Sequence, residues 1–165
     1  MNIRIAEKRD LEAVIRLYKD IIEDLDRRTN YPEWHWGSHP DLPMLEAAID
    51  NHELWLYEDE QQLYGAAIVN SALADGSQID WSGDDFCAIH LFGIHPERKR
   101  KGMADDFLTQ LINAQSASSI RLNFIAGNFP AENLYARHGF VHRGAATLDE
   151  GDGLLLDFVY MEKQL

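Results

Sequence analysis

A nearly continuous apolar run, Phe86–Ile94, stands in the middle of the chain and is followed closely by Pro96. A run of this kind is typical of a strand that is buried on both faces of a sheet. Four consecutive bases come next, Arg98–Lys101, and then Gly102 and an amphipathic helical pattern that reaches Ile112. The sequence therefore predicts a central buried strand, a basic loop and a helix in immediate succession.

The remaining pattern predicts shorter strands and further helices around that central strand. Helical stripes of apolar residues are expected at 11–25, 43–50, 102–112 and 130–138, with Asp10 in the first turn of the first helix and Asp41 as cap of the second. Strands are expected at 3–5, 54–57, 63–69, 86–94, 120–126, 140–142 and 154–161, with Ile79 and Trp81 as a strand extension. The order β-α-α-β-β-β-α-β-α-β-β predicts a mixed α/β (α+β) fold, in a single domain over 1–165.

Composition narrows the classes of function. The 165 residues carry 28 acids and 15 bases, a net charge of −13, which argues against a nucleic-acid partner. The chain has no apolar run near the roughly 20 residues that span a bilayer, and its first residues lack a secretion signal. Cys87 is the only cysteine, so no intramolecular disulfide is expected. A cytoplasmic protein without a membrane partner is the expectation.

The segment from the buried strand into the next helix could bind a phosphate. Backbone N–H groups at a helix start carry partial positive charge, and Gly102 and Ala104 would let a phosphate come close. The preceding bases, Arg98–Lys101, would add charge-assisted contacts. The alternative is a solvated basic turn before an ordinary helix. Neither a P-loop nor a dinucleotide fingerprint is present, so chemistry through those folds is not expected.

This segment resembles the acyl-CoA-binding motif of the GNAT superfamily of N-acetyltransferases, Gln/Arg-x-x-Gly-x-Gly/Ala. Lys99, Gly102 and Ala104 hold its three positions, and Lys99 keeps a cation where the family has Gln or Arg. The segment Asn128–Phe140 is similar to the family's Asn-x-x-Ala-x-x-Leu-Tyr-x-x-x-Gly-Phe, with every key position matched. The element order also matches, so the resemblance covers the chain except 30–40 and 71–85, and it implies a mostly antiparallel central sheet flanked by helices.

The resemblance implies transfer of an acetyl group from acetyl-CoA to an amine, without a metal. It places the pantetheine arm along the end of the central strand and the diphosphate at the helix start. The implied cofactor contacts are Phe92, Gly93, Ile94, Arg98, Lys99, Arg100, Lys101, Gly102, Met103, Ala104, Asn128 and Tyr135. Gly93 could instead serve packing, and Asn128 could instead cap the helix that follows it.

The same resemblance supplies candidates for catalysis. Tyr135 stands at the position of the family's general acid, which would reprotonate the leaving thiolate. His90 stands where several relatives have an acidic base, and an unperturbed imidazole pKa near 6.5 suits that task. The alternative for His90 is a core histidine with a backbone partner. Asp80, Asp84 and Asp85 are rival bases, acting through a water.

Other groups have smaller roles in the prediction. The backbone N–H of Phe92 or Ile94 could stabilise the oxyanion. Cys87 lies within an apolar strand, so it is expected to be buried and inert. His35 and His39 lie in a loop without a helix to align them, so no metal site is expected there.

The loop 30–40 carries the candidate acceptor-binding residues Tyr31, Trp34 and Trp36, whose rings could hold a cation or simply cover the core. The acceptor is expected to be a small-molecule amine or a peptide, and the sequence permits a homodimer without requiring one. A non-catalytic acyl-CoA-binding or sensor module on the same fold is the main alternative. Acyl transfer to oxygen and use of a longer acyl chain also remain open.

Overall fold

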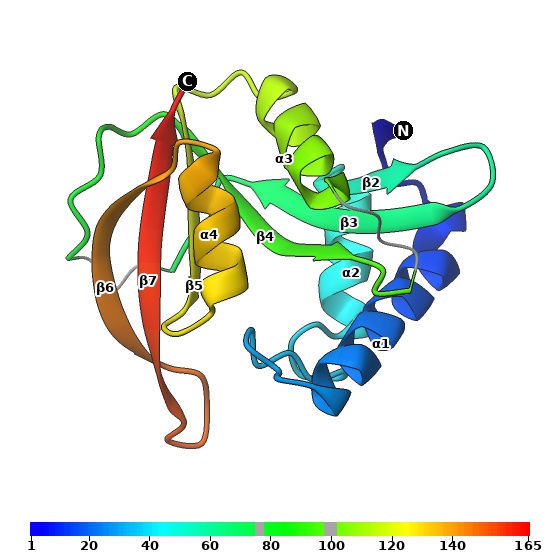
Figure 1. The fold of residues 1–165 in the computed structure, drawn as a ribbon, viewed down its shortest axis with the longest axis horizontal. Coiled ribbons are helices and arrows are strands. Elements are labelled where there is room, and N and C mark those ends of the chain that lie inside the picture. The colour runs from blue at the N-terminus through cyan, green and yellow to red at the C-terminus, as the bar shows by residue number, and fades with distance from the viewer. Residues whose placement is uncertain (75–77, 98–101) are drawn as a thin grey trace. The chain divides into compact units, whose positions relative to one another are not determined.

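The computed structural model describes residues 1–74, 78–97 and 102–165. Its elements in chain order (Figure 1) are β1 (Asn2–Ile5), a 3-10 helix (Lys8–Asp10), α1 (Leu11–Arg27), α2 (Leu42–Asp50), β2 (Leu54–Glu58), β3 (Leu63–Asn70), β4 (Phe86–Ile94), α3 (Met103–Asn113), β5 (Ser119–Ile125), α4 (Phe129–Arg137), β6 (Val141–Asp149) and β7 (Leu155–Gln164). This order confirms the predicted succession of strands and helices.

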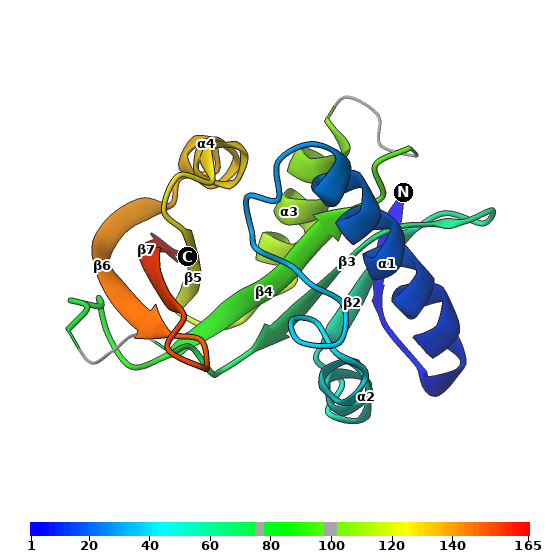
Figure 2. The same ribbon diagram turned by 90° about the horizontal axis from the view of Figure 1, so that it is seen from below.

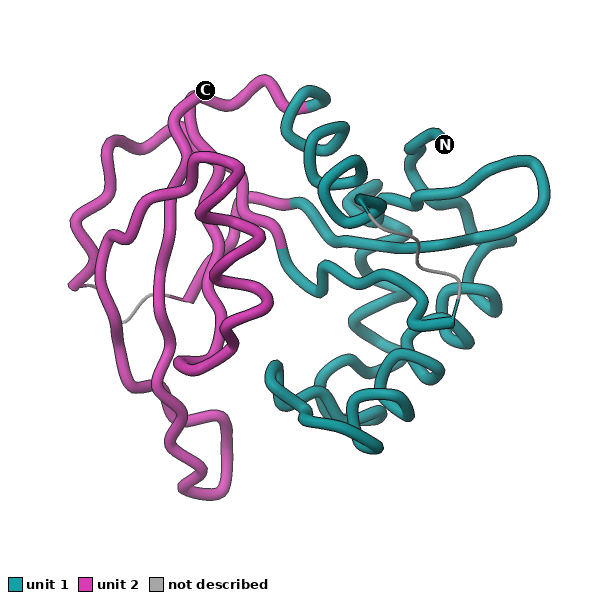
Figure 3. Tube along the Cα trace, viewed as in Figure 1, with its two compact units in different colours: residues 1–69, 90–114 teal, residues 70–89, 115–165 magenta. Residues whose placement is uncertain are grey.

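The seven strands found in the described part of the chain form one sheet in the order β1-β2-β3-β4-β5-β7-β6. The β1–β2, β2–β3, β5–β7 and β6–β7 pairs are antiparallel, whereas β4 and β5 are parallel. The predicted fold class, a mixed and mostly antiparallel sheet with helices, is therefore confirmed. The chain divides into two compact units, residues 1–69 with 90–114 and residues 70–89 with 115–165 (Figure 3). The single domain expected over 1–165 stays a prediction.

In unit 1, helices cover both faces of β2–β4, and α2 and α3 lie on opposite sides of these strands (Figure 2). Successive residues of a strand point to opposite faces, so alternate positions meet different helices. On the α3 face, the ring of Phe107 stacks on Tyr57 and Phe92, with centroids 4.9 and 5.0 Å apart. The core on the other face includes Val14, Leu17, Tyr18, Ile21, Ile22, Leu45, Ala48, Ile49, Leu54, Leu56, Ala66, Ile68 and Leu91. As its apolar sequence predicts, β4 is covered from both sides.

In unit 2, β7 lies between β5 and β6 and pairs with both over most of its length. The ring of Tyr135 on α4 packs near Phe124 of β5 and near Phe140, with centroids 6.1 and 5.7 Å apart. The hairpin is longer than predicted, because β6 extends from Val141 to Asp149. Only the first positions of β6 follow a clear apolar pattern, and the rest of the strand is specified by its pairing with β7.

A buried arginine of β5 contacts the segment before β4. The Arg121 guanidinium lies 4.5 Å from the Trp81 ring centroid and 4.1 Å from that of Phe86, and it donates to the Gly83 carbonyl and to Glu162. The strand extension expected at Ile79 and Trp81 is wrong, since this stretch forms no strand. Its order comes from side-chain contacts with Arg121 instead of a backbone ladder.

Among the described residues, none of the helices combines the length and the apolar character that a bilayer crossing needs.

We expect Glu162→Gln to destabilise unit 2 most at neutral pH. Arg121 and Arg143 both donate to this buried carboxylate, so losing its charge should cost about 3 kcal/mol. Burial raises the pKa of Glu162, but hydrogen bonds from Ser82, Arg121 and Ser119 outweigh it and bring the pKa below its ordinary value. The stabilisation is therefore present above the ordinary glutamate pKa and is lost as pH falls through the lowered value.

Urea unfolding of both proteins between pH 7 and pH 3 measures this difference, which should shrink at the acid end. The exposed Glu60→Gln variant is the control. A difference between wild type and Glu162→Gln that is the same at every pH would contradict the prediction.

Candidate active site

The last residues of β4 extend beyond its ladder with β5. The parallel ladder between β4 and β5 runs from Phe86↔Ser119 to Ala88↔Arg121, and within the described residues it goes no further. The residues Phe92, Gly93 and Ile94 come after that point, on the part of β4 that belongs to unit 1. A strand edge without a neighbouring strand can accept an extended ligand through main-chain hydrogen bonds.

Gly93 is a point of close approach. A Cβ at this position would lie 2.8 Å from Cδ1 of Ile21 and 3.5 Å from the ring of Trp34. Gly93 therefore has the packing role that the sequence left open. Ile21 of α1 and Trp34 of the loop after it fill the space that a side chain at this position would need. On β3, a Cβ at Gly65 would lie 2.7 Å from the Gly93 carbonyl oxygen. Two glycines thus let β3, β4 and α1 come together here.

The start of α3 is the candidate diphosphate site. Its N-cap is Gly102, whose φ of +86° lies in the left-handed region that favours glycine. A glycine cap brings no side-chain oxygen to the amides of the first turn, where Met103 and Ala104 follow. The basic residues Arg98, Lys99, Arg100 and Lys101 lie outside the described residues.

The first turn of α3 also contains two acids, Asp105 and Asp106, that the two motifs do not mark. A carboxylate there would repel a bound phosphate if it faced the amides. The Asp106 carboxylate instead accepts hydrogen bonds from Tyr57 Oη at 2.6 Å and Gln110 Nε2 at 2.9 Å. Burial, together with this carboxylate, raises the pKa of Tyr57, so its hydroxyl remains a donor. The Tyr57 ring lies under α3 and was predicted only as part of a strand.

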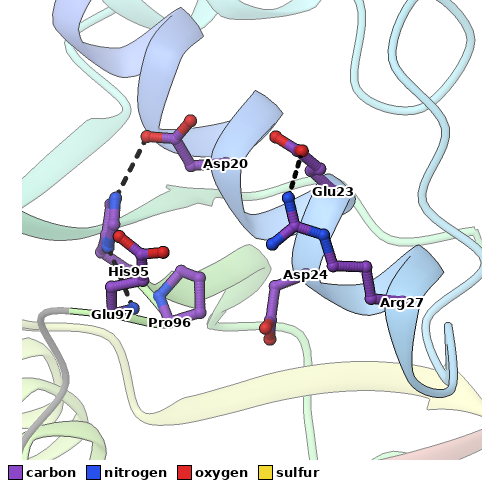
Figure 4. Close-up of a pocket in the computed structure, with 7 residues that line it drawn as sticks. All are labelled: Asp20, Glu23, Asp24, Arg27, His95, Pro96 and Glu97. Carbon is purple, nitrogen blue, oxygen red and sulfur yellow. Dashed lines mark hydrogen bonds and ion pairs between the residues drawn. The ribbon is translucent and has the colours of Figure 1, made fainter.

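A histidine that was not predicted as a site residue forms contacts between the end of β4 and α1. The side chain of His95 is 5% exposed; its Nδ1 accepts from the Glu97 amide at 3.2 Å, and its Nε2 lies 3.1 Å from Asp20 Oδ2. Since Nδ1 accepts, Nε2 carries the proton and donates to Asp20. Both contacts border an acidic pocket (Figure 4), which is lined by Asp20, Glu23, Asp24, Arg27, His95, Pro96 and Glu97. In the sequence, the only indication of this role is the position of His95 between the buried strand and Pro96.

Unit 2 carries Asn128 as the N-cap of α4 and Tyr135 within that helix. The Asn128 side chain is buried and accepts a hydrogen bond from the Ala131 amide at 3.3 Å. Asn128 therefore caps the helix, which is one of the two roles predicted for it. No other described residue accepts a hydrogen bond from its carboxamide N–H groups. Tyr135 is buried, burial raises its pKa, and its hydroxyl donates to no other described residue. A protonated phenol can donate a hydrogen bond to a ligand.

The candidate bases fall in different places. His90 is half-buried on β4 and belongs to unit 1, whereas Asp80, Asp84 and Asp85 are exposed in unit 2. Asp85 accepts from the hydroxyl of Ser118 at 2.5 Å and from its amide at 2.9 Å. These hydrogen bonds lower the pKa of Asp85, which makes it a weaker base than an ordinary carboxylate.

The three aromatic residues of the acceptor loop differ in exposure. Tyr31 is exposed, Trp36 is half-buried beneath Lys19 Nζ at 5.0 Å, and Trp34 is buried against Tyr18 in an edge-to-face contact. Trp34 therefore belongs to the core of unit 1, and Tyr31 and Trp36 present the accessible ring surface.

The remaining residues considered for chemistry are Cys87, His35 and His39. Cys87 is buried as expected, and burial raises its pKa to about 11. His35 and His39 are joined by backbone hydrogen bonds of 2.9 and 3.0 Å. Across residues 1–74, 78–97 and 102–165, no group of three His, Cys, Asp or Glu side chains is placed to hold a metal ion.

Comparison with known proteins decides the family. Residues 50–142 match the family model described as an acetyltransferase (GNAT) domain. The chain belongs to the GNAT acetyltransferase family. This assignment confirms the family expected from the two motifs, and it makes an acetyltransferase the enzyme class of this chain.

The similarity to individual relatives covers nearly the whole of this GNAT chain. YwnH of Bacillus subtilis, which is named provisionally as a phosphinothricin acetyltransferase, is 25% identical over 100% of this chain and 99% of its own. The crystal structure of a GNAT-family acetyltransferase from Streptococcus agalactiae has a TM-score of 0.80 at 17% identity, covering 99% of this chain and 95% of that one. The structure of Salmonella typhimurium yncA with its cofactor acetyl-CoA has a TM-score of 0.65 at 18% identity, covering 99% and 93%.

We expect Gly93→Ala to destabilise this GNAT protein by about 1–3 kcal/mol, because the new methyl group overlaps Cδ1 of Ile21. Ile21→Val removes that carbon and should recover most of the loss in the double variant. Gly83→Ala is the matched control, since a Cβ at Gly83 meets nothing within 4 Å. Urea unfolding of wild type, the two single variants, the double variant and the control measures the coupling between Gly93 and Ile21, and additive losses in the double variant would refute it.

We expect Cys87 to be dispensable for catalysis. With a pKa of about 11, only about one thiol in ten thousand is ionised at pH 7, and burial restricts access. Cys87→Ala should therefore turn over within about twofold of wild type, and iodoacetamide should react far more slowly than with free cysteine. Rapid alkylation with parallel loss of activity would show that the thiol takes part.

Proposed function

We propose that this GNAT domain transfers an acetyl group from acetyl-CoA to a primary amine of a small molecule or peptide by direct attack. The observation that carries the proposal is that β4 continues after Ala88, beyond its described ladder with β5, and is followed in the chain by the glycine-capped start of α3. The family supports the acetyl donor, and the relative solved with acetyl-CoA supports its identity.

The binding roles follow from the groups available. The backbone of Phe92–Ile94 pairs with the amide groups of pantetheine as an added strand would. The amides that start α3, at Gly102, Met103 and Ala104, take the diphosphate, and Arg98–Lys101 supply positive charge. Asn128 keeps its carboxamide N–H groups for the cofactor while its oxygen caps α4.

The chemistry needs one base and one acid. A primary ammonium with a pKa near 10 must lose a proton. His90 accepts this proton; the rival base is Asp80, Asp84 or Asp85, acting through a water. The amine nitrogen then bonds to the thioester carbon, the carbon–sulfur bond breaks, and Tyr135 gives its proton to the sulfur. The nitrogen, now bonded to the acetyl carbon, loses its surplus proton to solvent, and Tyr135 regains one from solvent. The N–H of Phe92 or Ile94 stabilises the oxyanion.

The acceptor binds beside the loop 30–40. Tyr31 and Trp36 offer ring faces for an ammonium, and Trp34 supports them from the core. The net charge of −13 favours cationic acceptors and disfavours nucleic acid, in keeping with a cytoplasmic enzyme that needs no membrane partner. A homodimer is compatible with this proposal but is not part of it.

The test of the mechanism is Tyr135→Phe. Release of the CoA thiol in an amine screen should fall about 10²-fold, because a general acid typically contributes 10²–10⁴-fold. CoA affinity should be nearly unchanged. Burial raises the pKa of Tyr135, so the wild-type rate should show no alkaline loss from this residue below about pH 10.

The matched control is Tyr160→Phe, another buried tyrosine of unit 2, whose hydroxyl donates to the Ala74 carbonyl. Wild-type turnover in Tyr135→Phe would remove Tyr135 from the mechanism. The non-catalytic sensor is the alternative, and Lys99 and His90 favour it by departing from the family's usual residues. It would be supported if CoA raises the melting temperature while no amine stimulates thiol release.

A further inference from the structure

Leu91 has a backbone conformation that a strand residue rarely adopts. Its φ is +49°, in the left-handed region that is costly for a bulky side chain. The other non-glycine residues with positive φ in the described part of the chain, Glu33, His52 and Asp152, all lie outside helices and strands. Leu91 alone among them lies inside a strand, directly before Phe92–Ile94. Backbone strain of this kind persists only where the surroundings impose it, and it clusters at functional sites.

One buried tyrosine contacts Leu91 directly. Tyr18 of α1 is fully buried, and its hydroxyl donates to the Leu91 carbonyl oxygen at 2.7 Å. Burial raises the pKa of Tyr18, so the hydroxyl stays protonated and keeps donating. The Trp34 ring packs edge-to-face on Tyr18 with centroids 6.0 Å apart, which fixes the direction of the ring. One turn further along α1, Ile21 rests against Gly93.

We propose that Tyr18 is a positioning residue for acetyl-CoA, which holds the left-handed turn at Leu91 and thereby aligns the backbone of Phe92–Ile94 for the pantetheine arm. The inference rests on the proposed function, because it assumes that this edge of β4 receives the cofactor. Tyr18 touches neither cofactor nor acceptor; it acts through the Leu91 carbonyl. The β4 backbone would otherwise relax toward an ordinary extended conformation at Leu91, which would rotate the peptide groups that follow.

The experiment measures two ligands on Tyr18→Phe. CoA carries the pantetheine arm, whereas adenosine 3′,5′-diphosphate lacks it. We expect Tyr18→Phe to weaken CoA about tenfold, which corresponds to about 1.4 kcal/mol, and to leave the affinity for adenosine 3′,5′-diphosphate unchanged. A general loss of folding would weaken both ligands alike. Tyr64→Phe is the matched control, since Tyr64 is equally buried in unit 1 but donates to the Asp59 side chain.

A second pair of variants tests the backbone conformation itself. In the Tyr18→Phe background, Leu91→Gly and Leu91→Ala both remove the buried side chain, but only glycine adopts φ near +50° without strain. The glycine variant should bind CoA about fivefold more tightly than the alanine variant. Equal binding by the two would overturn the proposal. If these variants fail to fold, the comparison of CoA with adenosine 3′,5′-diphosphate on Tyr18→Phe decides the matter by itself.

The outcomes separate this inference from the proposed function. If wild type does not bind CoA, the proposed function fails. If wild type binds CoA and Tyr18→Phe binds it as tightly as Tyr64→Phe does, the role of Tyr18 fails while the proposed function stands. If Tyr18→Phe weakens the binding of CoA and of adenosine 3′,5′-diphosphate equally, the role of Tyr18 as a positioning residue also fails, since that result indicates a structural role only.

Discussion

Strand β4 has to meet two requirements along its length. Its first residues, Phe86–Ala88, pair in parallel with β5, and its last residues lie between the side chains of α1 and those of α3. Close packing on both faces leaves no space for side chains at Gly93, and the Gly93 carbonyl in turn leaves none at Gly65. Core packing near crystal density makes such positions sensitive to a single methyl group. The backbone edge offered to a ligand is thus fixed by packing on either side of it.

The conformation of Leu91 illustrates how such an edge is maintained. A left-handed residue costs roughly 1–2 kcal/mol, and one buried hydrogen bond contributes about 1 kcal/mol. The hydroxyl of Tyr18 therefore offsets much of the cost but does not exceed it, and the packing of Trp34 and Ile21 against the same region supplies the rest. A strained segment held in this way is rigid before a ligand arrives, which reduces the entropy that binding would otherwise lose.

Unit 2 uses polar contacts for a similar purpose. The stretch from Trp81 to Asp85 has no ladder partner, and it is held by Arg121, Glu162 and Ser118. Buried ion pairs contribute little net stability compared with apolar packing, but removing one partner is expensive because a charge is left alone. The network therefore fixes the position of this segment more than it stabilises the fold. It also occupies Asp85, one of the three rival bases.

The sequence by itself determined the order of elements, the burial of β4 and of Cys87, and the two motifs that indicate the GNAT family, because periodicity and glycine spacing are local properties. It also identified Asp41 as a cap, which the structure confirms. Only the tertiary structure decided that Trp34 belongs to the core, that Asp106 and Asp85 are engaged, and that His95 and Tyr18 support β4. These roles depend on contacts between residues far apart in the chain, and a hydroxyl or carboxylate carries no local sign of which distant group it will meet.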